Sequence, residues 1–255
     1  MASFIINTQG ELLKTRKTMA FWLTIAGSAF VSVVNMIRYL SVPDEVIRQF
    51  KNDHWARHIR DSFQPAAAFV MPMFVILVTS LVVQIEYRNN TWKQVYASPR
   101  SYADIFFSKF CIIHILILSF LILFNMFLVL CAWIPNIFYH DYAFFTTAVP
   151  WEKMLSLSLR LYVAVLGMAA IQYWISLRIR NFIAPMGIGV ALLIIGFMIF
   201  QRNKIIYYPY AYAAVTFFKD KSSEPMGIQG VYSFVWMGAI LALSFWDTVT
   251  RREKG

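Results

Sequence analysis

Side chains that could do chemistry are few and widely spaced in this sequence. Lys, Arg, Asp and Glu together make up only 14% of its 255 residues. The sequence has no G-x-x-x-x-G-K-[ST] phosphate loop, no H-E-x-x-H zinc pattern, no G-x-S-x-G nucleophile pattern and no cysteine pair with metal-ligand spacing. We therefore expect no catalytic residues, no bound metal and no nucleotide hydrolysis by this chain alone. Energy for any driven process must come from another polypeptide or from an ion gradient.

A charged segment at residues 41–64 is the densest cluster of ionisable side chains, with four acids, four bases and two histidines. His54 and His58 are spaced by about one helical turn, and Asp61 follows nearly one turn later, so an amphipathic helix would place them on one face. A zinc site needs further firm ligands. The pattern therefore favours surface histidines, and the role of this segment stays open.

Several polar residues lie inside otherwise apolar stretches. Arg160 is a candidate buried charge, because a cation within a bilayer is costly and often functional. It also lies close enough to Glu152 for its side chain to extend to the membrane surface. The other polar residues are expected to form hydrogen bonds between helices: Asn35, Gln84, His114, Asn125 and Gln172. Cys111 and Cys131 lie about 30 Å apart along one helix, so they cannot form a disulfide with each other.

Apolar residues dominate the composition, at 59% of the chain, and the mean hydropathy is +0.58. A soluble domain is about half apolar, so these values exclude an ordinary soluble enzyme, a disordered tail and a disulfide-rich secreted domain. We expect an all-α membrane protein with a single transmembrane domain over residues 1–255. Pro65 should begin the second span, and Pro72 could kink it. The expected spans cover about residues 18–37, 66–85, 105–133, 154–177, 182–200 and 228–246.

The net charge of +10 is typical of basic membrane proteins, and no recognition motif indicates nucleic acid. Six spans place both termini on one side, and basic residues next to the first and last spans favour the cytoplasm. The total number of basic residues hardly distinguishes the two orientations, because 12 Lys and Arg lie on that side and 11 on the other. The outer charges share longer loops with more acids, which favours the same orientation.

Residues 86–104, between the second and third spans, predict a short helix followed by a new helix start. Asn90 can cap the short helix, and Trp92, Val95 and Tyr96 share one of its faces. Pro99 ends it, and Ser101 with Asp104 resembles a capping box that opens the third span. Such a short helix is marginal alone, so its aromatic face should either rest in lipid headgroups or dock against a cytoplasmic partner.

These residues resemble a known family, the membrane subunits of bacterial ATP-binding-cassette (ABC) exporters of the second permease type. The resemblance is strongest to the small permeases of the lantibiotic self-protection and bacitracin-type group. It lies in the run Glu11-Leu-Leu-Lys14 with Arg16-Lys17-Thr18 and Phe21-Trp22, then in Glu86 with Asn90-Thr91-Trp92-Lys93 and Pro99-Arg-Ser101, and in Lys109.

The resemblance implies two cytoplasmic elements. Residues 4–17 match an interfacial elbow helix, with Ile5 and Leu12 toward the membrane. The water-facing residues would be Glu11, Lys14 and Arg16. Residues 90–97 match the coupling helix that docks in a groove of the ATPase subunit, where Trp92 and Tyr96 would be the anchors, with support from Glu86, Asn90, Thr91, Lys93, Val95 and Pro99. Glu86 could pair with Arg88, Lys109 or cations of the elbow helix.

The family also has short re-entrant helices between its fifth and sixth spans. Residues 205–218 fit this position, because they are apolar and aromatic but too short to cross. The candidate outer gate there consists of Tyr207, Tyr208, Pro209 and Tyr210. The alternative is a belt of tyrosines at the membrane interface, which would also include Tyr212.

The resemblance implies the permease subunit of an ABC exporter in the bacterial cytoplasmic membrane. It would pair with a second permease, identical or related, and with two ATPase subunits that bind ATP and Mg, and it would move a hydrophobic or amphipathic cargo such as a peptide antibiotic or a lipid. The alternatives are a gradient-driven secondary transporter, which would normally have acids at mid-span, an intramembrane enzyme, and a non-transporting sensor or assembly protein.

Overall fold

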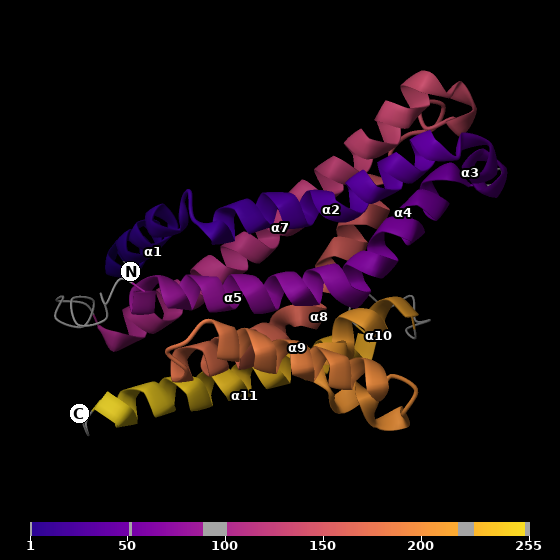
Figure 1. Cartoon of the computed structure of the whole chain (residues 1–255). Helices are drawn as coiled ribbons and strands as arrows, with labels where there is room; N and C mark the ends of the chain where they lie inside the picture. Colours follow the sequence, from indigo (N-terminus) through magenta and orange to yellow (C-terminus); the bar gives the residue numbers. More distant parts are fainter. Residues whose placement is uncertain (1, 51–52, 89–100, 219–226, 253–255) are drawn as a thin grey trace.

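A computed structural model describes residues 2–50, 53–88, 101–218 and 227–252. Every regular element among these residues is a helix, and the described part of the chain contains no strand. Figure 1 shows both termini at the same end of the molecule, which we call the terminal end. From there two arms diverge toward the distal end: one contains α2, α4 and α7, and the other contains α9, α10 and α11.

The chain enters the bundle through a short helix and a tight turn. α1 (Ala2–Thr15) is followed by Lys17 in the left-handed region, with φ 63°. This conformation ends α1 and redirects the backbone into α2 (Met19–Ser41), the first long apolar helix. α3 (Pro43–Phe50) then turns the chain back at the distal end.

The second long helix is longer than the sequence predicted. α4 (His54–Pro65), a π-helical turn (Ala66–Val70) and α5 (Met71–Arg88) follow one another without a break. The prediction that Pro65 begins a helix is therefore wrong. The Met71 N–H donates to the carbonyl of Ala66, five residues earlier. This wider turn comes just before Pro72, whose ring would clash with a carbonyl four residues back in an ordinary α-helix.

The third and fourth long helices are α7 (Tyr102–Phe138) and α8 (Trp151–Arg178). The 37 residues of α7 extend about 55 Å at 1.5 Å per residue, well beyond a hydrocarbon core of about 30 Å. The Ser101 side chain accepts a hydrogen bond from the Asp104 N–H at 3.0 Å, which confirms the predicted cap. A 3-10 turn, η2 (His140–Tyr142), follows α7 at the distal end.

The last part of the chain contains one short and one long apolar helix. α9 (Ile183–Met198) leads into two 3-10 turns, η3 (Asn203–Tyr207) and η4 (Pro209–Ala211), then α10 (Tyr212–Phe218). α11 (Gly227–Arg252) completes the described chain.

Five helices in the described regions are long and apolar enough to cross a membrane. The fifth predicted span, residues 182–200, is instead represented by α9, which has 16 residues and covers about 24 Å. Six full-length spans are therefore not observed.

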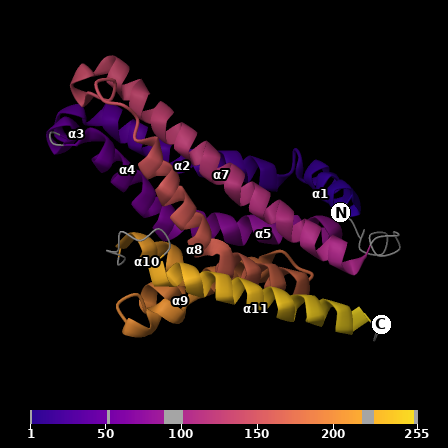
Figure 2. The same cartoon turned by 180° about the vertical axis from the view of Figure 1, so that it is seen from behind.

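Two close helix pairs hold the arms together. α2 lies along α7, and α8 lies along α11, with α5 between the pairs (Figures 1 and 2). Gly167 of α8 permits the second pair, because a Cβ at this position would lie 2.9 Å from the Cβ of Trp236. The Gly167 N–H donates to the Ser233 hydroxyl at 3.0 Å. Close backbone approach and a hydrogen bond thus fix α8 against α11.

Candidate functional site

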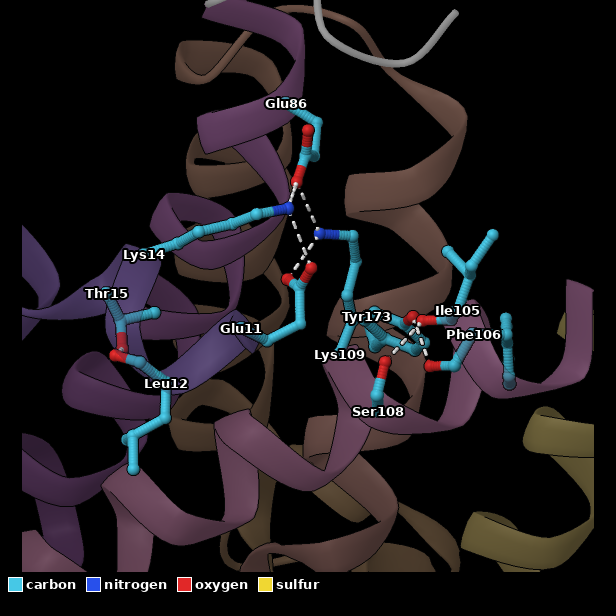
Figure 3. Close-up of polar contacts among 10 residues, drawn as sticks. All are labelled: Glu11, Leu12, Lys14, Thr15, Glu86, Ile105, Phe106, Ser108, Lys109 and Tyr173. Carbon is cyan, nitrogen blue, oxygen red and sulfur yellow. Dashed lines mark hydrogen bonds and ion pairs between the residues drawn. The ribbon is translucent and has the colours of Figure 1, made fainter. Parts of the chain in front are cut away.

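Two carboxylates and two ammonium groups meet where α1 packs against α5 and α7 (Figure 3). Lys109 Nζ lies 2.7 Å from Glu11 Oε2 and 3.0 Å from Glu86 Oε1. Lys14 Nζ lies 2.9 Å from Glu11 Oε1 and 2.8 Å from the same Glu86 oxygen. We call these four residues the ion network. Each cation bridges both acids, so the network joins three helices that are distant in sequence.

Three of the four residues in the ion network are buried in the protein. Glu11 is 6% exposed, and Glu86 and Lys109 are each 1% exposed. Removing an ion from water costs several kcal/mol, which is offset only when opposite charges and hydrogen bonds surround it. Two positive and two negative side chains satisfy this condition together. Each is therefore stabilised in this position by its oppositely charged partners.

Lys14 covers the open side of the network, with 38% of its side chain exposed. Burial lowers the pKa of its ammonium group, but hydrogen bonds to Glu86 and Glu11 outweigh that effect, so the pKa is raised above its ordinary value. Lys14 therefore stays protonated throughout the physiological pH range.

Local structure explains why these four side chains meet. Glu86 lies two residues before the end of α5, and Lys109 lies two turns after the Ser101 cap of α7. Glu11 and Lys14 lie in the second half of α1. The network therefore clamps the two helix ends that border residues 89–100 and attaches them to α1.

The predicted coupling residues mostly lie outside the described residues: Asn90, Thr91, Trp92, Lys93, Val95, Tyr96 and Pro99. Glu86 is described, and it pairs with Lys109 and Lys14, two of the partners considered from the sequence.

The elbow helix differs from its prediction in one important respect. Ile5 and Leu12 are 55% and 44% exposed, as a membrane-facing surface requires, and Arg16 is exposed. Glu11, expected to face water, is buried. Helical periodicity placed it on the polar face, but Lys109 of α7 neutralises it there.

A second polar centre lies between the two arms, around the amide of Gln172. Its Nε2 donates to the carbonyl of Pro185 at 2.9 Å and to the hydroxyl of Ser80 at 3.3 Å. Its Oε1 accepts a hydrogen bond from the hydroxyl of Tyr210 at 3.0 Å. Gly189 leaves space for this oxygen, because a Cβ there would lie 2.6 Å from it. The amide thus links α5, α8, α9 and η4.

The candidate outer gate folds back against the bundle. The Tyr208 hydroxyl donates to the carbonyl of Leu192 at 2.7 Å, Pro209 is buried, and Tyr210 is 3% exposed. Tyr207 is 57% exposed. The alternative prediction, a belt of tyrosines at the membrane surface, is wrong for Tyr210 and Tyr212, because both are buried within the protein. The polar Gln172 in an apolar helix was the sequence signal for this contact, but it did not identify Tyr210.

The intramembrane polar residues behave mostly as expected. Asn35 bonds to Ser62 at 3.0 Å, and Asn125 bonds to Ser158 at 2.7 Å. His114 contacts the Tyr162 hydroxyl, and Gln84 donates to the carbonyl of Ile179. These contacts and those of Gln172 confirm the predicted interhelical hydrogen bonds. Both cysteines are free.

Arg160 is half-buried rather than enclosed. The fully buried cation is Lys109, near the start of its helix, where the sequence pattern gave less reason to expect burial.

The distal end is held by aromatic rings instead of charges. His58 is 0% exposed, so its prediction as a surface residue is wrong. Its Nε2 lies 3.0 Å from the carbonyl oxygen of Leu128 and must donate, which leaves Nδ1, at 2.7 Å, to accept from the Tyr39 hydroxyl. The rings that surround this pair are all less than 5% exposed. We define the aromatic cluster as His58 with Tyr39, Phe50, Trp55, Tyr142 and Phe144.

The described residues contain no group of three or more His, Cys, Asp or Glu side chains that could hold a metal ion. Residues 8–196 match the family described as ABC-2 family transporter protein. The chain belongs to this ABC-2 family. No curated protein and no solved structure matches it.

Membership of the ABC-2 family establishes that the chain is a membrane permease of an ABC transporter and a non-catalytic transmembrane subunit. It is a multi-pass membrane protein. ABC-2 permeases typically pair with ATPase subunits. The match covers α2 to nearly all of α9, and it includes Glu11, Lys14, Glu86 and Lys109.

Proposed function

We propose that this ABC-2 permease is the membrane subunit of an ATP-driven exporter. It pairs with a second permease, identical or related, and with two cytoplasmic ATPase subunits that bind ATP and Mg. Its cargo is hydrophobic or amphipathic, either a peptide antibiotic or a lipid-like molecule. The resemblance to permeases of lantibiotic self-protection and bacitracin-type systems supports this cargo class, and the family match supports the requirement for an ATPase partner.

The observation that carries the proposal is the position of the ion network. It joins the end of α5, the first turns of α7 and the elbow helix α1 around the segment proposed to contact the ATPase. A displacement of residues 89–100 would therefore be transmitted to three helices at once. Buried ion pairs suit such a joint, because separating them without replacement partners is costly and keeps the helices moving together.

We further propose that the terminal end faces the cytoplasm and that α9 is the fifth of six spans in one domain. The proposed outer gate then lies on the opposite side of the membrane, between α9 and α11. Tyr210 and Gln172 would connect this gate to α5. The helix α5 would thus be connected to the gate through Gln172 and to the joint with the ATPase through Glu86.

The alternatives fit the described structure less well. The buried acids among the described residues, Glu11 and Glu86, lie at the ends of helices and are already paired, whereas a gradient-driven transporter would use acids near mid-span. A sensor or assembly protein would keep the joint but lack vectorial activity. Vanadate-sensitive ATP hydrolysis that cargo stimulates in the reconstituted complex would support the exporter over these alternatives.

The test of the proposed joint is a double substitution of its aromatic anchors. Trp92→Ala with Tyr96→Ala should release the ATPase subunits during purification while the permease remains inserted, because buried aromatic anchors dominate docking energy. The matched control is Tyr139→Ala with Trp151→Ala. Both residues are exposed aromatics, one directly after the end of α7 and the other at the start of α8, away from residues 89–100. Unchanged co-purification of the ATPase with the Trp92 and Tyr96 variant would refute the coupling helix.

A further inference from the structure

A groove opens at the terminal end between α2, α5 and the turn from α8 to α9. Its volume is about 640 Å³. The apolar part is lined by Leu23, Leu77 and Leu81, each half-buried. Gln84, Tyr87 and the exposed Arg180 lie along its rim. The groove therefore has an apolar interior and a polar, positively charged edge.

The length of the groove matches one leaflet of a bilayer. Leu77 and Tyr87 are ten residues apart on α5, which corresponds to about 15 Å along the helix. Half of a hydrocarbon core about 30 Å thick is the same distance. The polar edge coincides with the end of α5 and the turn at Arg180, where lipid headgroups would lie. The groove therefore matches a phospholipid from end to end: the leucines lie where an acyl chain would be, and the polar edge lies where the headgroup would be.

Arg180 should make the groove prefer a negatively charged ligand. No ion pair joins it to any residue that the structure describes, in contrast to Arg178, which pairs with Asp247 at 2.6 Å. The backbone near Arg180 is held in place, because Gln84 donates to the carbonyl of Ile179 and Tyr87 donates to that of Leu177. An exposed guanidinium without an ion pair to the described residues, carried on an anchored backbone beside an apolar groove, is complementary to a phosphate on an acyl chain.

We propose that this groove binds an anionic phospholipid of the cytoplasmic leaflet, with its phosphate at Arg180 and an acyl chain along Leu23, Leu77 and Leu81. The site rests on the orientation in the proposed function. An acyl chain gains little on leaving bulk lipid for an equally apolar groove. The headgroup charge must therefore supply the selectivity, while the groove supplies the shape.

The experiment measures lipid retention by the full chain in detergent, using native mass spectrometry. The probes are phosphatidylglycerol and phosphatidylcholine with identical acyl chains. The unmodified chain should bind phosphatidylglycerol about fivefold more tightly, the effect expected of one basic residue near a membrane surface. Arg180→Gln should remove this preference, and Arg180→Lys should retain most of it. Arg202→Gln, a change to an exposed arginine at the other end of α9, should leave it intact.

A groove-filling variant tests the apolar half of the site. Leu81→Trp should weaken retention of both lipids, because it occupies the space of the acyl chain. The proposal is overturned if Arg180→Gln keeps the preference or if Arg202→Gln removes it equally. It is also overturned if Leu81→Trp abolishes dimerisation without changing lipid retention, since the groove would then bind a second copy of the chain. The assay needs no ATPase, so its failure is distinguishable from failure of the aromatic anchor test.

Discussion

The two ends of this ABC-2 permease hold their helices together by opposite chemistry. At the terminal end, four charged side chains form a neutral ion network across α1, α5 and α7. At the distal end, rings of the aromatic cluster enclose the buried His58. Ion pairs depend on every partner, whereas aromatic packing is spread over many weak contacts. The comparison sets the proposed joint with the ATPase, held by a few interdependent charges, against a distal end held by many aromatic contacts.

Removing Lys109 should have the largest effect, because it would take from two buried acids the buried cation that pairs with both. We expect Lys109→Met to lower the free energy of unfolding by about 3–5 kcal/mol, measured by equilibrium unfolding in detergent. Adding Glu86→Gln should recover part of this loss. Lys153→Met, a change to an exposed lysine, is the control. Equal losses for the two lysine variants would show that the ion network is not a stabilising unit.

Disrupting the aromatic cluster should have a smaller effect. His58→Leu leaves the Tyr39 hydroxyl and the Leu128 carbonyl without their partner. We expect a loss of about 1–3 kcal/mol in the free energy of unfolding, with no recovery from any compensating charge change. His140→Leu, at an exposed position nearby, should be close to neutral. If His58→Leu cost as much as Lys109→Met, the contrast between the two ends would fail.

Breaking the hydrogen bond between Gln172 and Tyr210 should lower the free energy of unfolding by less than either change above. Tyr210→Phe removes one neutral hydrogen bond and should cost about 1 kcal/mol. A double-mutant cycle with Gln172→Leu should show coupling between the two changes, and Tyr207→Phe serves as the exposed control. Additive effects in the cycle would mean that the outer gate segment is not held by this amide.

The smallest expected effect is at the pair between Arg178 and Asp247, whose cation is exposed although its carboxylate is only 15% exposed. The side chain of Arg178 is 46% exposed, so water and salt screen the interaction. We expect Arg178→Gln to cost less than about 1 kcal/mol and the difference to shrink at high salt. Arg202→Gln, at an exposed position with no ion pair to the described residues, is the control. A cost independent of salt would show that this pair resembles the buried network.

Much of the layout follows directly from local sequence. Long apolar stretches predicted most of the spans, and Ser101 with Asp104 predicted the start of α7. Helix ends between the spans were less predictable. The helix continues through Pro65, and the π-helical turn before Pro72 avoids the clash with an earlier carbonyl that would otherwise break the helix at Pro72. The 16-residue α9 is shorter than its apolar stretch, because the chain turns back into the tyrosine-rich segment.

The candidate site was predicted less completely than the spans. Glu86 was expected to find a cation from α7 or the elbow helix, and it does. Glu11 was assigned to water and His58 to the surface because helical periodicity describes only one helix at a time. The pattern within α1 gives no information about Lys109, which pairs with Glu11, and the pattern within α4 gives none about Tyr39 and Leu128, which bond to His58.

The sequence by itself determined a helical membrane protein without a recognisable phosphate-loop motif, because composition and motifs are properties of the chain alone. The permease function came from its resemblance to a known family. Only the tertiary structure decided which charges are buried together and which cation remains at the rim of the groove. Lys109 and Glu11 are 98 positions apart, and burial of either charge is favourable only when packing has already brought the other within 3 Å.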